Sequence, residues 1–169
     1  MNTSLPPVLD ASGHRLAIAD LADAPAILGL ARAFHEEDGH PLSGQGERAL
    51  GHLLADQTYG LVFKIDGPSG VVGYAVLCFG YSVELGGRDV FLDDFYIVPS
   101  ERGQGLGHSV MDGLVGFARE GRFVALHLEV IAGNRAEVFY RRLGFRDRGS
   151  AFLTLRLQPR DNPGRMDEA

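Results

Sequence analysis

The sequence contains a single cysteine, Cys78, and no apolar stretch long enough to cross a bilayer. One thiol has no partner for an intrachain disulfide, so we expect a disulfide-free protein. The longest nearly unbroken apolar run, VVGYAVLCFGY from Val71, has eleven residues, whereas a membrane-spanning helix needs about 20. Its β-branched and aromatic residues favour a buried strand instead.

Signals for export and for nucleic-acid binding are also missing. The first residues, MNTSLPPVLDAS, lack the basic start and apolar core of a secretory signal, so we expect a cytoplasmic protein without a membrane partner. The formal net charge is −6, and no basic stripe is interleaved with aromatic residues. This charge argues against nucleic acid as a partner and mildly favours cationic ones.

The histidines predict no metal site. Their spacing is not that of metal ligands, and neighbouring acids or cysteines do not complete a ligand set. This holds for His35, His40, His52, His108 and His127.

The length of 169 residues and a hydrophobic content of 45% suit one compact domain with a ligand cleft. We find no internal repeat and no linker that would divide the chain. The expected organisation is an N-terminal extension over residues 1–13, a domain over 14–157 and a disordered polar tail over 158–169.

The first part of the domain predicts a strand followed by two helices. HRLAIA from His14 alternates like a strand, and Asp20 with Asp23 forms a partial capping box before Pro25. An apolar stripe then runs to Phe34 and ends in HEEDGHPLSG, which reads as a loop. A shorter helix follows, carrying Leu50, Leu53 and Leu54.

From Tyr59 the apolar period changes to that of strands. Runs at 59–66, 71–85 and 89–98, joined by glycine turns, predict an antiparallel meander. Next come a helix from Leu106, a strand at 122–130, a helix at 135–143 that Gly144 ends, and a hairpin at 145–157.

Three glycines stand at alternate positions in VPSERGQGLGHSVMDGL, between the strand at 89–98 and the following helix. Gly103, Gly105 and Gly107 let the backbone curl so that several N–H groups face one concavity, and the helix N-terminus adds positive charge. A pyrophosphate fits such a loop, although a glycine-rich turn without a ligand would have the same composition. The spacing excludes both the G-x-G-x-x-G loop and the G-K-[ST] loop.

RGQGLG from Arg102 resembles the R/Q-x-x-G-x-G/A signature of the GNAT family of N-acetyltransferases, and NRAEVFYRRLGF from Asn134 resembles that family's second motif. The resemblance covers roughly residues 14–157 and includes the order of the elements. LDDFYIVPSERGQGLG is most similar to the diamine acetyltransferase-like branch. The resemblance implies an α/β fold in which helices flank a mixed, largely antiparallel sheet.

The resemblance also implies a binding site for acetyl-CoA as cosubstrate. The backbone of Ile97 and Val98 would bind the pantetheine arm, and the family motif places an asparagine, here Asn134, beside it. Asn134 lies six residues before Tyr140, whereas the family's asparagine lies seven before it. The diphosphate would be held by backbone amides of Arg102, Gly103, Gln104, Gly105, Leu106, Gly107 and His108.

Acetylation of an amine needs a base, because an alkyl ammonium has a pKa of about 10, and an acid for the departing thiolate. The resemblance implies that Tyr140 is the acid and Asp93 the base; without it, the residues favour Tyr140 as an aromatic packed on the sheet. Strand alternation predicts that Asp93 and Asp94 point to opposite faces, with Asp94 beside Leu92, so that they form no catalytic dyad. Asp94 could bind the acceptor or satisfy loop amides or an arginine.

Other acids could contact a cationic acceptor or could simply be solvated. Glu84 and Glu129 belong to predicted strands, and Glu37 lies in the predicted loop after the first helix. We therefore expect an enzyme that acetylates a primary amine of a small molecule by direct transfer, and the resemblance favours a homodimer. The alternatives are a protein or peptide N-acetyltransferase and a catalytically silent coenzyme A-binding sensor.

Overall fold

The computed structural model describes residues 13–131, 133–134 and 136–157. These residues belong to two compact units, one ending at Ile131 and the other following it. Residues 1–12 of the expected extension and the expected tail at 158–169 lie outside the described residues. The domain boundaries at 14 and 157 stay a prediction.

The first unit begins with β1 (Arg15–Ile18) and two helices. The predicted capping box at Asp20 and Asp23 is confirmed, and it opens a short 3-10 turn, η1 (Leu21–Asp23), before α1 (Ala24–Glu37). α1 therefore continues through Glu37, and the prediction that His35 to Glu37 lie in a loop is wrong. The helix ends where Gly39 adopts a φ of 75°, which glycine accommodates easily. α2 (Gly44–Ala55) follows.

The meander is confirmed as β2 (Gly60–Gly67), β3 (Gly70–Ser82) and β4 (Gly87–Ile97), each antiparallel to the next. After η2 (Pro99–Glu101) and α3 (Leu106–Glu120), β5 (Ala125–Leu128) pairs with β4 in parallel. The strand order is β1-β2-β3-β4-β5. β5 is shorter than the run predicted at 122–130, but the mixed, largely antiparallel sheet of the α/β fold is confirmed.

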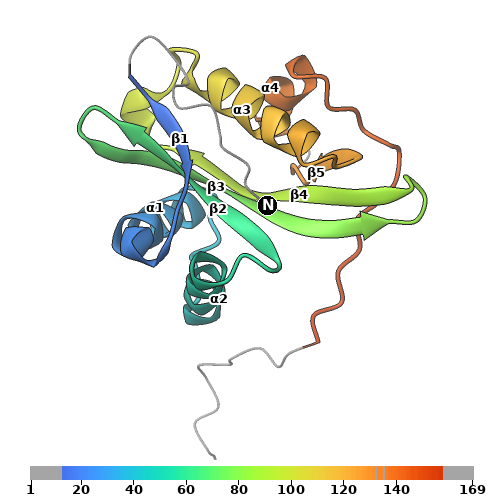
Figure 1. Ribbon diagram of the computed structural model, residues 1–169, viewed down its shortest axis with the longest axis horizontal. Helices are drawn as coiled ribbons and strands as arrows, with labels where there is room; N and C mark the ends of the chain where they lie inside the picture. Colours follow the sequence, from blue (N-terminus) through green and yellow to red (C-terminus); the bar gives the residue numbers. More distant parts are fainter. Residues whose placement is uncertain (1–12, 132, 135, 158–169) are drawn as a thin grey trace, which may run out of the picture. The chain divides into compact units, whose positions relative to one another are not determined.

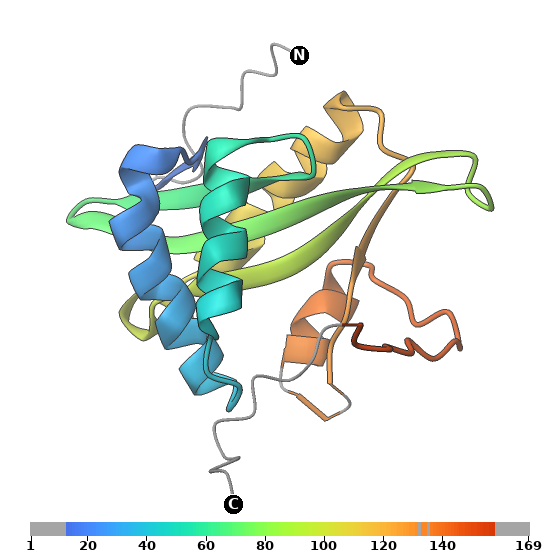
Figure 2. The ribbon, with the colours of Figure 1, turned by 90° about the horizontal axis from the view of Figure 1, so that it is seen from below.

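Helices cover both faces of this sheet (Figure 1). α1 and α2 lie side by side on one face, over a core that includes Tyr74, Val76 and Tyr96 (Figure 2). α3 covers the other face, where the ring of Phe117 meets that of Phe63 at 5.2 Å between centroids. None of the helices in the described part of the chain is long and apolar enough to span a membrane.

The second unit contains α4 (Ala136–Arg142), and Gly144, with a φ of 94°, follows its end as predicted. The hairpin predicted at 145–157 is wrong, because these residues form no strand. An alternating apolar pattern describes only how the side chains of a strand would be arranged. A hairpin also requires backbone hydrogen bonds between two paired strands. Four large apolar side chains in the later part of this segment are exposed: Phe152, Leu153, Leu155 and Leu157.

Candidate active site

β4 is paired differently along its two halves. Residues Asp89 to Leu92 pair with β3 on one edge and with β5 on the other. Beyond Leu92, β4 continues to Ile97 along β3, whereas β5 ends at Leu128. Within the described chain no strand covers this edge of residues 93–97, so some of their backbone N–H and C=O groups face an open side.

A β-bulge lies at Asp93, where the closed half gives way to the open half. Leu92 pairs with Leu77 and Asp94 with the adjacent Val76, which leaves Asp93 as the extra residue. Since Val76 and Leu77 point to opposite faces, Leu92 and Asp94 do too. The prediction that Asp94 shares a face with Leu92 is wrong, because strict alternation cannot include an inserted residue.

Asp94 is held in a network on the face that α1 covers. The Tyr74 hydroxyl donates to Asp94 Oδ2 at 2.7 Å, and His35 Nε2 lies 3.4 Å from the same oxygen. Burial, followed by the charge of Asp94, raises the pKa of Tyr74, so this phenol stays a hydrogen-bond donor. Sequence reasoning missed this use of Tyr74 and His35, because one lies in an apolar run and the other 59 positions before Asp94.

Asp93 is solvent-accessible, yet protein atoms surround its carboxylate closely enough to affect its ionisation. Burial and then the negative charge of Asp94 raise its pKa above the ordinary 3.8, and His35 opposes this shift. The charges of both acids raise the pKa of Tyr74 and of Cys78. Asp93 and Asp94 therefore share one electrostatic environment, and Asp93 is the more accessible of the two.

The glycine loop follows directly on the open half of β4. Gly103 and Gly105 have φ values of 81° and 91°, and no other residue comes within 4 Å of where their Cβ atoms would lie. Gly105 is the N-cap of α3 and accepts from the N–H groups of His108 and Ser109. Within the described chain, the N–H groups of residues 103–107 donate to no backbone group that the structure records. The loop is thus an open turn at a helix N-terminus, suited to an anion.

Some backbone groups of Ile97 and Val98, just before the loop, already take part in hydrogen bonds within the protein. Val98 N–H donates to Val72 O at 2.9 Å, and Glu101 N–H donates to Val98 O. Ile97 O accepts from Arg102 Nε at 2.6 Å. A further contact of Ile97 O or Val98 O would therefore use the second lone pair of the carbonyl oxygen.

The Arg102 side chain ties the loop to the end of α1. Its guanidinium donates to both carboxylate oxygens of Glu37, at 2.6 and 2.9 Å, and lies over the Tyr96 ring. These hydrogen bonds hold the pKa of Glu37 below its ordinary range. Glu37, predicted as an acceptor ligand, thus neutralises Arg102, a contact across 65 residues that no local pattern reveals.

The two remaining predicted acceptor ligands are Glu84 and Glu129. Glu84 is in the turn between β3 and β4, not in a strand, and Asp94 lies ten residues further along the chain. The seven residue-to-residue steps from Gly87 to Asp94 span roughly 23 Å. Glu129 is exposed and follows the end of β5.

In the second unit, Tyr140 lies on α4 between the rings of Phe139 and Phe145, with centroids 5.1 and 5.7 Å away. Burial raises the pKa of Tyr140 to about 12, so its hydroxyl is protonated at neutral pH and can donate a proton. Asn134 Oδ1 accepts from Ala136 N–H at 2.9 Å and so caps the first turn of α4. Part of its side chain therefore has a structural role.

In the described part of the chain, no group of three or more His, Cys, Asp or Glu side chains could hold a metal ion. The absence of a metal cofactor stays a prediction.

Comparison with known proteins connects this geometry to a family. Residues 16–145 match the sequence profile of the acetyltransferase (GNAT) family. The thialysine N-epsilon-acetyltransferase of Bos taurus is 33% identical over 112 residues, which are 66% of this chain. The chain spans 65% of the length of that relative.

Solved structures share the fold. An integron cassette protein from the mobile metagenome of Cole Harbour Salt Marsh is 31% identical, with a TM-score of 0.75, over 85% of this chain and 91% of its own. A predicted acetyltransferase from Clostridium acetobutylicum, solved with acetyl-CoA, has a TM-score of 0.69 at 20% identity. That match covers 85% of this chain and 96% of the other.

Proposed function

We propose that this chain, which belongs to the acetyltransferase (GNAT) family, transfers an acetyl group from acetyl-CoA to a primary amine of a small molecule. The observation that carries the proposal is the open half of β4, which leads directly into the glycine loop at the N-terminus of α3. A strand edge with unpaired polar groups suits an amide-containing arm, and the loop suits a diphosphate.

The glycine loop meets the requirements of a diphosphate site. A side chain at position 103 or 105 would project into space that no other residue now fills, and the α3 terminus attracts negative charge. We assign the diphosphate to the amides of Gly103, Gln104, Gly105, Leu106 and Gly107. The N–H groups of Arg102 and His108, at the two ends of the predicted set, already donate to Pro99 O and Gly105 O. Ile97 and Val98 would bind the pantetheine arm, and a pantetheine contact of Asn134 stays a prediction.

We assign the acid and base roles to Tyr140 and Asp93. When bound, acetyl-CoA supplies an activated acetyl group. Asp93 is accessible, and its raised pKa makes it a better proton acceptor for the ammonium than an ordinary carboxylate. Tyr140 keeps its proton at neutral pH and can donate it to the departing thiolate. Asp94 accepts a hydrogen bond from the Tyr74 hydroxyl. Its negative charge contributes to the raised pKa of Asp93 and would attract the cationic amine.

Direct transfer is favoured over an acyl-enzyme, because the one thiol of the sequence is a poor nucleophile. Cys78 is half-buried in β3, and burial together with the charges of Asp93 and Asp94 raises its pKa to about 11. At neutral pH the thiolate is therefore scarce. Cys78→Ala should retain activity if the protein folds normally.

The acceptor class is inferred from the relatives and from local charge. The Bos taurus relative is a thialysine N-epsilon-acetyltransferase, so we propose a small primary amine as acceptor. Asp93 and Asp94 place negative charge at the open end of β4, which suits a cationic acceptor. Glu129, Glu84 and Glu37 stay weaker candidates for contact with it. A homodimer and a cytoplasmic location also stay predictions.

The test is release of free thiol from acetyl-CoA with a panel of polyamines, amino acids, aminoglycosides and short peptides. Release with one class of small amine, reduced about a hundredfold or more in kcat by Tyr140→Phe, supports the proposal. Phe139→Leu, on the neighbouring position of α4, is the control and should retain most activity.

Other outcomes would move the conclusion to a different function. Release with peptides alone would indicate a protein or peptide N-acetyltransferase. Tight binding of acetyl-CoA without release to any acceptor would indicate a sensor. Absence of acetyl-CoA binding would overturn the assignment of the glycine loop itself.

A further inference from the structure

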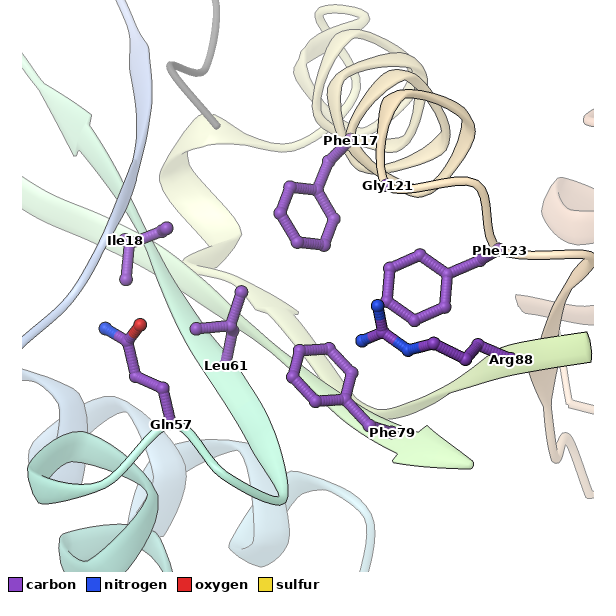
Figure 3. A pocket seen from close by; sticks show the side chains of 8 residues that line it. All are labelled: Ile18, Gln57, Leu61, Phe79, Arg88, Phe117, Gly121 and Phe123. Atoms are coloured by element: carbon purple, nitrogen blue, oxygen red, sulfur yellow. The ribbon is translucent and has the colours of Figure 1, made fainter. Parts of the chain in front are cut away.

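A pocket of about 200 Å³ lies in the first unit, at the end of the sheet where β4 begins (Figure 3). Its walls are mostly apolar and include the rings of Phe79, Phe117 and Phe123. The polar side chains on its lining are Arg88 and Gln57. Aromatic walls with a few polar groups are typical of small-molecule sites.

This pocket is separate from the proposed acetyl-transfer site. Arg88 is near the start of β4, and Ile97, which precedes the glycine loop, ends it. The nine residue-to-residue steps between them span roughly 30 Å. None of the pocket's lining residues has been assigned to acetyl-CoA or the acceptor, so an inference about it does not depend on the proposed function.

The guanidinium of Arg88 is held against two rings. Its central carbon lies 4.3 Å from the ring centroid of Phe123 and 5.4 Å from that of Phe79. In Figure 3 the guanidinium lies between these rings, with nitrogens directed toward the middle of the pocket. Aromatic faces attract the cation and restrict its motion, so less entropy is lost when it binds an anion.

Arg88 carries the one charged side chain among the residues that line the pocket. None of these residues carries a carboxylate, and the adjacent Asp89 has its carboxylate 3.4 Å from His127. The last carbonyl groups of α3 also have partners, since the N–H groups of Gly121, Arg122 and Phe123 donate to residues 117–119. The helix end thus presents fewer unpaired acceptors near the pocket.

The size of the pocket limits its ligand to about one ring. An apolar cavity of about 150 Å³ is known to hold benzene, so about 200 Å³ leaves room for one small substituent. A carboxylate is the group that a planar guanidinium binds best, through two parallel hydrogen bonds. Gln57 could donate a further hydrogen bond from its amide.

We propose that this pocket, formed where Arg88 stacks on Phe79 and Phe123, is a binding site for small aromatic carboxylates, with benzoate as the simplest example. The rings of the pocket hold the aromatic body of the ligand, and Arg88 holds its carboxylate.

The test is saturation-transfer NMR on the full chain with benzoate as probe and benzamide as its neutral counterpart. Benzoate should bind with a dissociation constant of about 1 mM or tighter, and benzamide about tenfold more weakly. Arg88→Met keeps an unbranched side chain against the rings but removes the charge, and should also weaken benzoate about tenfold. Arg119→Met, an exposed position in the last turn of α3 outside the pocket, is the matched control and should change binding less than about twofold.

Three results would overturn the inference. The first is no binding of benzoate at about 10 mM. The second is equal binding of benzoate and benzamide by the unmodified protein, a comparison that needs no variant to fold. The third is displacement of benzoate by acetyl-CoA, which would place the probe in the other site.

Discussion

The two halves of β4 differ in what surrounds them. Residues 89–92 lie between two hydrogen-bonded strands, and Val90 is completely buried. Within the residues that the structure describes, the segment 93–97 pairs on one edge alone; it begins with a bulge and carries two carboxylates. One strand thus serves stability in its first half and, in the function we propose, binding and chemistry in its second. The division follows from the end of β5 at Leu128.

Gly105→Val should give the largest effect, a loss of acetyl-CoA affinity. It changes the loop that follows the open half of β4 and leaves the closed half intact. Gly105 has a φ of 91°, which a β-branched residue adopts only with strain, and the new side chain would enter the proposed diphosphate cradle. Affinity for acetyl-CoA should fall about a hundredfold through lost charge-assisted hydrogen bonds. Isothermal titration measures it.

Gly116→Ala is the control for this variant. Gly116 lies inside α3 with no other residue within 4 Å of its Cβ position, so alanine should fit and favour the helix. Equal loss of acetyl-CoA affinity in both variants would contradict the assignment of the loop.

Val90→Ala tests the closed half. It removes two methyl groups from a fully buried site between Phe79 of β3 and Leu126 of β5, and should lower the free energy of unfolding by about 2 kcal/mol. Urea denaturation measures the change. Affinity for acetyl-CoA should stay within about twofold wherever the variant is folded. A loss of acetyl-CoA affinity in the folded variant would contradict the claim that the first half of β4 serves stability alone.

Asp93→Asn should reduce kcat/KM for the amine about tenfold at pH 7, less than a fully enclosed base would cost, because solvent can take the proton at this accessible position. In the unmodified enzyme kcat/KM should decline as pH falls through the pKa of Asp93, which lies above 3.8. Thiol release across a pH series measures both. Glu129→Gln is the control, and an equal loss there would point to general surface charge.

The same variant should have a smaller and opposite effect on stability. A raised carboxyl pKa means that the folded state favours the neutral form, so stability is fully present below the unfolded pKa and is lost as pH rises through the folded pKa. Asp93→Asn should therefore raise Tm slightly at pH 7, and the gain should vanish below about pH 4. A lower Tm at pH 7 would show that the Asp93 carboxylate stabilises the fold.

Local patterns predicted most of the first unit. The capping box at Asp20, the helical stripes and the glycine turns of the meander each depend on residues a few positions apart. The hairpin at 145–157 failed, since a strand also needs a partner that alternation does not specify. The prediction of a loop at His35 to Glu37 was wrong, because acidic residues can also occupy the last turn of a helix, as they do in α1.

The candidate site was less predictable, because several of its features depend on contacts between residues far apart in the sequence. The glycine loop is contiguous, so its composition indicated its place before α3. The bulge at Asp93 depends on how β3 aligns with β4 and has no signature in the strand itself. The contacts of Asp94 with Tyr74 and of Arg102 with Glu37 join distant positions. Only the folded chain shows that these charged groups already have partners.

The most direct test of the account is to follow backbone amide signals by NMR while acetyl-CoA is added. The account predicts the largest shifts in residues 93–107, from the bulge through the glycine loop, with residues 87–90 of β4 nearly unchanged. Shifts concentrated in the closed half, or no shifts at saturating acetyl-CoA, would contradict the claim that the open half of β4 and its loop form the acetyl-CoA site.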